Sequence, residues 1–527
     1  MMNNSVPTSP EEWRQYWQAK GFPWRMEPEI DTKRQEELSK CRAIVPDIEK
    51  GIYPFKGMKL SRADMEWLLA THENGRGPVD WNDEKQRERE GLDMRGAELS
   101  GVDLSNLPLA RICGGHAIAN TRLTDPVTKE KERMAAVLLT GANLRGAHLE
   151  GASLKRAVLM KADLTEAHLE STDLRWANLA GVKFHSAHLK KVNLSNAFLE
   201  DADFLVAHVE GVDLKQAYLK NARFLVEGNL RGTFLMEAYL VGADFTGRDL
   251  EGVNLVAAHL ENADLSGTHL KGADLTNANL TDANLWFARL EGASLARTNL
   301  TRTNLSRASL DGASLDGTTL SDKMHVGPYL ADVHWGDTNL TIAKWSQVKI
   351  LGDEYEAKRK LNRSGKEKFE ITRSEEYEAA VRANRQLAIV LQNQGLNEDA
   401  DRFVYRSKVL QRKVLWKQGN FWKWLGSTIL ALLTGYGYRM WRIIVAYLAI
   451  VLLCAVAYYV LGLSYEPHLS FLDAVLISIT AFHGRVFSEP FLHPGEPQLW
   501  VTAFEAIMGL VIEGMFIAML TQKFFGK

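Results

Sequence analysis

Two carboxylates stand in an otherwise apolar stretch near the end of the chain, "LWVTAFEAIMGLVIEGMFIAMLT" at 499–521. Four of its residues are three or four positions apart, so a helix places them on one face: Glu505, Gly509, Glu513 and Phe516. A carboxylate within an apolar helix faces a bundle interior or a water-filled cavity. We therefore expect these residues to line and gate a pore, with an anionic ring at Glu513. The alternative is that Glu513 is held in a contact between subunits.

A second set of chemically active residues precedes that stretch, in "AFHGRVF" at 481–487. Arg485 either faces the pore, where several copies repel cations, or lies behind it as a strut paired with Glu489 or Glu505, because a buried charge needs a partner. Both alternatives stay open. The same two alternatives stay open for His483, and a pore-facing His483 would make conduction depend on pH, since histidine titrates near neutrality.

Four histidines recur every 20 residues in the middle of the chain, at His148, His168, His188 and His208. Such a column can bind a metal or sense pH. No carboxylate or cysteine column accompanies it consistently, however. We interpret it as a tolerated ladder on an exposed face, and we predict no metal site and no cofactor.

Two apolar segments must position the C-terminal residues. Residues 443–463 contain 21 residues without a charge, enough for a helix of about 31 Å, and residues 499–521 form the second segment. Between them, "FLDAVLISITAF" at 471–482 is too short to span a bilayer. An arrangement of this kind predicts a first transmembrane helix (443–463), a pore helix and filter (470–488) and a second transmembrane helix (499–521).

Basic residues flank these segments on one side. The loop between the apolar segments carries only Arg485, whereas the flanks carry Lys417, Lys423, Arg439, Arg442, Lys523 and Lys527. The positive-inside rule then places both termini in the cytoplasm, with two spans in the plasma (inner) membrane. Membrane lipid and ions are the expected partners.

The tetrapeptide "TGYG" at 434–437 resembles the carbonyl filter of potassium channels. It precedes the first apolar segment, however, whereas a filter follows a short helix between two spans. Its two glycines suit an elbow after an amphipathic stretch at 420–433. We therefore assign 420–442 to an interfacial helix and an elbow.

The order of segments after residue 440 resembles the two-transmembrane, pore-loop family of potassium-channel-like proteins. "FLDAVLISIT" is similar to the pore helix of that family, and Gly509 stands where the family has a hinge glycine. The resemblance implies a homotetramer with a selectivity filter after the pore helix, at Thr480, Ala481, Phe482, His483, Gly484 and Arg485. Because "AFHGRVF" replaces the glycine-rich potassium filter, potassium selectivity is not expected.

A period of five residues runs through the middle of the chain, as in "ANLRGAHLEGASLKRAVLMKADLT" at 142–165. A chain that turns a corner every five residues points one apolar residue per side inward, and four sides make a coil of 20 residues. Coils should stack at about 4.8 Å. This predicts an internal column of Phe184, Phe204 and Phe224, continued by Phe245 after a one-residue slip near Gly228.

The pattern is similar to that of the pentapeptide-repeat family, which implies a right-handed quadrilateral β-helix over residues 91–350, with an insertion at 110–133. Residues 137–350 carry 25 acidic and 21 basic side chains. That balance is too even for a nucleic-acid mimic, and no nucleic-acid partner is expected. We find no phosphate loop, zinc spacing or nucleophile motif, so an enzyme is not predicted.

The β-helix has helical flanks in this prediction. Residues 1–90 are expected to form a mostly helical cap over one end of the solenoid. Residues 351–419 carry two apolar stripes separated by Gly395, with Asn397 as a helix cap, and predict a charged helical hairpin of tetratricopeptide type that serves as an adaptor.

The leading hypothesis is thus a homotetrameric ion channel whose cytoplasmic pentapeptide-repeat domain regulates it or docks a protein or ligand. The alternative is a membrane-anchored interaction scaffold that does not conduct.

Overall fold

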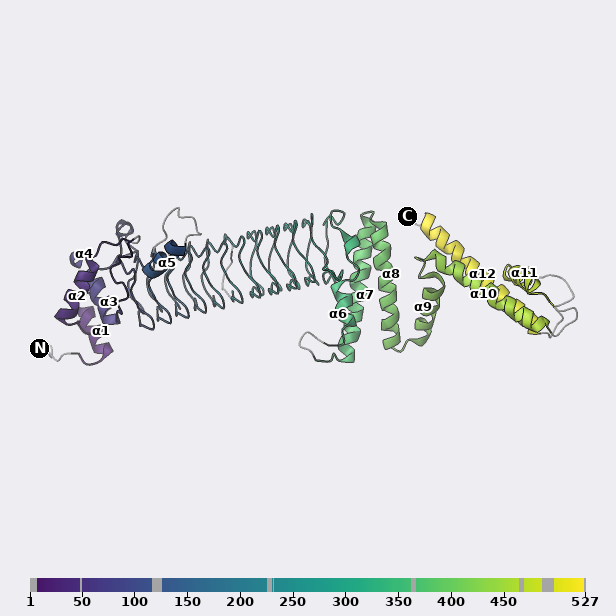
Figure 1. The fold of residues 1–527 in the computed structure, drawn as a ribbon, viewed down its shortest axis with the longest axis horizontal. Coiled ribbons are helices and arrows are strands. Elements are labelled where there is room, and N and C mark those ends of the chain that lie inside the picture. Colours follow the sequence, from purple (N-terminus) through teal and green to yellow (C-terminus); the bar gives the residue numbers. More distant parts are fainter. Residues whose placement is uncertain are drawn as a thin grey trace. The chain divides into compact units, whose positions relative to one another are not determined.

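The structure is a computed structural model that describes residues 7–47, 50–115, 126–224, 230, 232–361, 366–463, 469–485 and 497–525. The chain divides into two compact units, Met1–Tyr355 and Glu356–Lys527. Figure 1 traces both of them along the sequence. The first unit is the solenoid with its end segments, and the second is helical.

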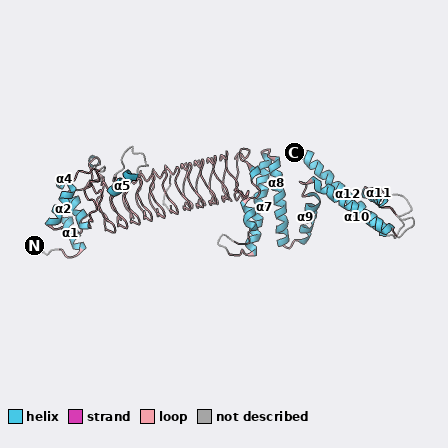
Figure 2. Cartoon of the chain, in the orientation of Figure 1, coloured by secondary structure: helices cyan, strands magenta, loops and turns pink. Residues whose placement is uncertain are grey.

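The solenoid is a stack of four-sided coils. Single residues pair in parallel with residues 20 positions later, as in Leu138 with Val158 and Asn143 with Asp163. In the regular coils, one residue separates each paired residue from a two-residue turn. Figure 2 therefore shows the stack as turns without long strands. The predicted 20-residue coil is confirmed, while its handedness stays a prediction.

The repeat explains the turns chemically. In many turns an Asp or Asn stands two residues before the turn, and its Oδ1 accepts a hydrogen bond from the backbone N–H of the second residue after it, as between Asp163 Oδ1 and Thr165 N at 3.0 Å. Asp264 and Ser266 repeat the contact at 2.9 Å. These side chains mimic a backbone turn. The Leu that lies between them points inward and is fully buried, as at Leu164.

The predicted aromatic column occupies the interior. Adjacent rings of Phe184, Phe204, Phe224 and Phe245 are stacked with centroids 5.0, 4.6 and 4.6 Å apart. All four side chains are buried. This confirms that residues 20 positions apart share one side of the solenoid.

The one-residue slip is also present. Pairing changes to a separation of 21 between Asp213 and Phe234, and it returns to 20 between Phe234 and Asn254. The residues that contain the slip, including Gly228, lie outside the described part of the chain.

The insertion begins later than predicted. Cys113 still pairs with Asp93 on one side and with Ser153 on the other. The separation of 40 between Cys113 and Ser153, instead of 20, corresponds to an insertion of one coil's length between them. The prediction was wrong because Gly114 occupies the central position, where a Cβ would lie 2.6 Å from Val137 Cγ1. Helix α5 (Pro126–Ala135) follows.

Short helices cover the N-terminal end of the solenoid (Figure 1). Arg62, on the helix nearest the coils, donates to the carbonyl oxygens of Asp103 and Ser105 at 3.2 and 3.1 Å. Its Nε donates to the buried Glu66 at 2.8 Å. The helices are α1 (Pro10–Ala19), α2 (Thr32–Arg42), α3 (Arg62–Ala70) and α4 (His72–Gly75), with the 3-10 helix η1 (Glu84–Gln86).

A buried carboxylate lies at the C-terminal end of the solenoid. The 3-10 helix η2 (Trp345–Gln347) precedes α6 (Gly352–Lys358). Asp353, in α6, accepts hydrogen bonds from the backbone N–H groups of Leu330 and Ala331 at 2.7 and 3.2 Å. Burial raises the pKa of this carboxyl to about 7, although both hydrogen bonds favour the charged form.

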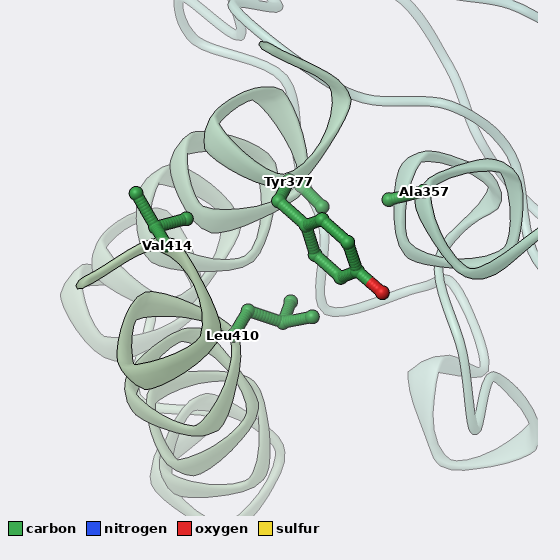
Figure 3. Close-up of a cluster of buried hydrophobic side chains, with 5 residues drawn as sticks. Ala357, Tyr377, Leu410 and Val414 are labelled. Carbon is green, nitrogen blue, oxygen red and sulfur yellow. The ribbon is translucent and has the colours of Figure 1, made fainter. Parts of the chain in front are cut away.

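The second unit begins with a helical hairpin of α7 (Glu370–Asn393) and α8 (Asn397–Lys417). Figure 3 shows Tyr377 of α7 packed against Leu410 and Val414 of α8 and Ala357. Gly395 makes the turn at φ 81°. Asn397 is the first helical residue, and no side chain caps this helix, so its predicted capping role is wrong.

The tetrapeptide at 434–437 forms an elbow between α9 (Phe421–Thr434) and α10 (Met440–Gly462). Gly435, Tyr436 and Gly437 all have positive φ, at 56°, 59° and 91°. Three successive left-handed residues stop one helix and turn the chain into the next.

The unit ends with α11 (Phe471–Phe482) and α12 (Pro497–Phe525). Two segments, Trp441–Gly462 and Pro497–Thr521, are long and apolar enough to cross a membrane by length and composition. They correspond to the two spans predicted from the sequence.

Candidate functional site

The short helix α11 runs alongside α10 rather than across its end. At the start of α11, the ring of Phe471 lies 5.9 Å from that of Tyr459. At its end, Phe482 lies 4.8 Å from Tyr447. The two α10 residues are twelve positions apart, which is about 18 Å along a helix. The C-terminal end of α11 therefore reaches the level of the first third of α10.

The same face of α11 also packs against α12, through a buried polar contact. Ser478 Oγ donates to Glu505, whose side chain is fully buried, and it also contacts the Val451 carbonyl at 2.9 Å. Closer to the C-terminal end of α10, Tyr458 forms a hydrogen bond of 2.9 Å with Thr502 of α12. These contacts join all three helices within one chain.

Gly509 allows the closest approach between α11 and α12. A Cβ at this position would lie 1.8 Å from the carbonyl oxygen of Phe482. The two helices can touch only because residue 509 has no side chain. The sequence marked Gly509 as a hinge, and in the structure it makes a packing contact.

The third residue of the predicted face, Glu513, meets the end of α11. Its Oε1 lies 2.5 Å from Nδ1 of His483, and both side chains are about half exposed, at 46%. They border a cavity of about 230 Å³ that is otherwise lined by Ile443, Ile444, Tyr447, Phe482, Ile512 and Phe516.

The four predicted pore-lining residues thus fall into two groups. Glu505 and Gly509 are enclosed among the helices of one chain. Glu513 and Phe516 line the cavity. A pore-lining role stays a prediction for all four. Ser478, the partner of Glu505, was missed because a serine in an apolar helix gives no distinctive signal.

Half of the predicted filter is helical. Thr480, Ala481 and Phe482 form the last turn of α11, and His483 caps it. The carbonyl oxygen of Thr480 accepts from the N–H of Arg485 at 2.9 Å, and that of Ala481 accepts from Gly484 at 3.0 Å. An extended row of free carbonyls is therefore absent from the helical residues, and only the segment from His483 onward remains open to a filter role.

Arg485 is exposed, whereas Glu505 is buried against Ser478. Among the described residues no ion pair joins them, so the predicted Arg485–Glu505 strut is not formed. The other predicted partner, Glu489, lies outside the described residues.

The histidine ladder of the first unit is present. Successive rings of His148, His168, His188 and His208 are stacked with centroids 4.6, 4.8 and 4.8 Å apart. The carboxylate at the first rung was not predicted: Glu150 Oε1 lies 3.0 Å from His148 Nδ1. The signal was a Glu two residues after three of the four ladder histidines, at Glu150, Glu170 and Glu210.

A second stack on the surface was also missed. Adjacent rings of Phe198, Tyr218, Tyr239 and His259 have centroids 5.0, 4.7 and 4.6 Å apart. The same 20- and 21-residue spacing could have revealed it, because all four occupy the outward position before a buried Leu.

Comparison with known proteins identifies the repeat. The family model of pentapeptide repeats matches eight copies, within residues 138–175, 167–204, 225–255, 258–296 and 287–322. No curated protein matches this chain.

Three solved structures of pentapeptide repeat proteins match parts of this chain. HetL, a pentapeptide repeat protein involved in heterocyst differentiation regulation in the cyanobacterium Nostoc sp. strain PCC 7120, is 24% identical; the match covers 50% of this chain and 95% of HetL, with a TM-score of 0.20. Rfr23 from the cyanobacterium Cyanothece 51142 is 28% identical, over 32% and 89% of the two chains, with a TM-score of 0.15.

A pentapeptide repeat protein from the Arabidopsis thaliana thylakoid lumen is 29% identical, over 22% of this chain and 74% of that protein, with a TM-score of 0.11. The family match shows that the chain contains pentapeptide repeats within residues 138–322, and its C-terminal unit carries two long apolar helices.

Proposed function

We propose that the protein is a membrane ion channel in which four copies of the C-terminal unit surround a pore. In this proposal α10 and α12 cross the plasma (inner) membrane, and α11 enters the bilayer between them and returns to the same side. Both termini and the solenoid lie in the cytoplasm, where the solenoid regulates the pore or docks a partner.

The observation that carries the proposal is the depth of α11. If α10 spans the bilayer, the contact of Phe482 with Tyr447 places the end of α11 well inside it. An irregular chain is tolerated at that depth only where it is buried in protein or lines water. A purely anchoring module has no need for a short helix that reaches so far along a span.

The polar pair at the end of α11 supports the same proposal. His483 and Glu513 lie beside a cavity and are half exposed within one chain. Ionisable side chains at membrane depth mark ion pathways more often than structural sites. Four copies of Glu513 around an axis would favour cations, while four exposed Arg485 side chains would oppose them.

Reversal potentials test this proposal. Purified full-length protein in planar bilayers, under asymmetric salt, should give discrete current steps with a reversal potential away from zero. The Glu513→Gln variant should shift that potential toward anions, because it removes four negative charges from the pathway. If conductance and reversal potential are unchanged in this variant, Glu513 does not line the ion pathway.

A membrane-anchored scaffold is the second candidate, and one observation favours it. Glu505 and Gly509 are used for packing within a single chain, which explains two of the polar and small residues of α12 without any pore. Absence of current steps from verified tetramers under every gradient would favour the scaffold.

A further inference from the structure

Glu150 is an unusual carboxylate for the surface of a solenoid, because its side chain is only 8% exposed. The loop before the first coils covers it, and the ring of Trp81 would lie 2.6 Å from a Cβ at the neighbouring Gly151. Its Oε1 faces His148, but Oε2 has no hydrogen-bond partner. A buried polar atom without a partner costs about 1–3 kcal/mol, and more when it is charged. A ligand for Oε2 would remove that cost.

Two imidazoles stand beside this carboxylate. His148 and His168 are stacked with centroids 4.6 Å apart and planes inclined by 3°. One donor atom from each of His148, Glu150 and His168 lies within 4.8 Å of the other two. The first two histidines of the ladder and the buried carboxylate therefore bring three potential ligand atoms close together.

We propose that His148, Glu150 and His168 bind a divalent transition-metal ion of the Zn²⁺ class. Two imidazole nitrogens and one carboxylate oxygen suit Zn²⁺, Co²⁺, Ni²⁺ and Cu²⁺. Mg²⁺ and Ca²⁺ prefer sites built from oxygen ligands. Three protein ligands leave a fourth position, which faces solvent and takes a water molecule.

The site needs only a small adjustment. With Zn–N distances of about 2.0–2.1 Å, neighbouring ligands of a tetrahedral ion lie about 3.3 Å apart. The three ligand atoms lie within 4.8 Å of one another, a wider spacing than that. His148 is 45% exposed, so its ring can rotate about the side-chain torsions and close the gap. Glu150 is fixed by its surroundings and sets where the ion sits.

Imidazole and carboxylate ligands must be deprotonated to bind a metal ion, so the affinity of this site should fall as the pH is lowered.

The same chain contains a matched control. His259 and Glu261 repeat the i, i+2 pair, with Nδ1 and Oε1 3.6 Å apart. The stacked neighbour of His259 is Tyr239, and Asn279 follows it in the next coil, where its amide donates to Glu261 at 2.6 Å. This pair lacks a second imidazole.

The experiment uses full-length protein without an affinity tag, purified in detergent and stripped with a chelator. Titration with ZnCl₂ by calorimetry should reveal one saturable site per chain, and MgCl₂ should give none. Glu150→Gln and His168→Gln should each weaken zinc binding at least tenfold. His208→Gln, at the far end of the ladder, and His259→Gln should leave it unchanged.

Two readouts can overturn the proposal. An equal loss of affinity in the His208 or His259 variant, or no saturable zinc site in the wild type, would contradict the assigned ligands. Titration with CoCl₂ provides the second readout: thiolate charge-transfer bands in the near ultraviolet would assign the ion to cysteine instead. Thermal melting of each variant checks that Glu150→Gln and His168→Gln remain folded.

Discussion

Two glycines of α12 differ sharply in what surrounds them, and this difference can be measured. A Cβ at Gly509 would collide with the carbonyl oxygen of Phe482, whereas a Cβ at Gly514 would meet no atom within 4 Å. Gly509→Ala should therefore destabilise the C-terminal unit by about 1–3 kcal/mol, as overpacking does. Thermal unfolding of the full-length protein in detergent would show a lower midpoint.

Gly514→Ala is the matched control on the same helix. It should leave the midpoint unchanged or raise it, because alanine favours a helix over glycine by about 1 kcal/mol. If the two variants behave alike, α11 does not pack against α12 at Gly509.

The buried carboxyl group of Asp353 should make the free energy of unfolding depend on pH. Its pKa is about 7 in the folded chain, against 3.8 for an ordinary Asp. Between these values the folded state binds more protons than the unfolded state, so the free energy of unfolding should fall as the pH rises from about 4 to about 7 and then level off. The buried carboxylate therefore destabilises the end of the solenoid at neutral pH.

The Asp353→Asn variant should remove this dependence, because the amide cannot ionise and its oxygen still accepts a backbone hydrogen bond. Denaturant unfolding across that pH range would show that the free energy of unfolding of the variant, relative to that of the wild type, increases as the pH rises. Asp316→Asn, at an exposed residue of the solenoid, controls for the loss of one negative charge. A constant difference between Asp353→Asn and the wild type would contradict the assignment.

At the scale of elements, the elbow between α9 and α10 depends on left-handed residues. Gly437 has φ 91°, and a Cβ at Gly435 would lie 2.9 Å from Arg439 Cβ. Alanine at both positions should strain the turn by about 1–3 kcal/mol. We expect impaired assembly or gating, seen as a lower yield of intact oligomer or a changed open probability.

Ion preference should survive this change, because the elbow is not part of the proposed pathway. Gly426→Ala is the control, since residue 426 lies within α9 and has no atom within 4 Å of its Cβ position. Altered permeability ratios in the elbow variant would contradict its mechanical role and revive a filter role for this tetrapeptide.

How well each element could be predicted depends on the range of its contacts. The solenoid repeats every 20 residues, so the stack of Phe184 on Phe204 could be predicted from spacing alone. The boundary of the insertion could not be predicted from spacing, because a glycine, Gly114, occupies a central position that elsewhere holds a large apolar residue. In the C-terminal unit, the common face of Glu505 and Gly509 followed from helix geometry. Their partners Ser478 and Phe482 depend on how α11 docks, which no local pattern encodes.

At the scale of the whole molecule, the proposed channel requires several copies of the chain. Within one chain, Glu505 is enclosed and α10 to α12 pack directly against one another, so the described helices of a single copy leave no continuous path for an ion. Large apolar side chains remain exposed on the outer sides of α10 and α12, among them Leu448, Leu452, Ile507 and Leu510. In the proposed channel, these surfaces face lipid or other copies.

Native mass spectrometry of the full-length protein, released from lipid nanodiscs, should therefore give a mass four times that of the 59.2 kDa chain. Bound lipid should add to this mass without changing the stoichiometry. The Gly509→Ala variant should give a smaller fraction of tetramer, because its C-terminal unit, which forms the tetramer, is destabilised. A monomer or dimer as the largest species of the wild type would leave no enclosed pathway. The spans would then be anchors for the solenoid.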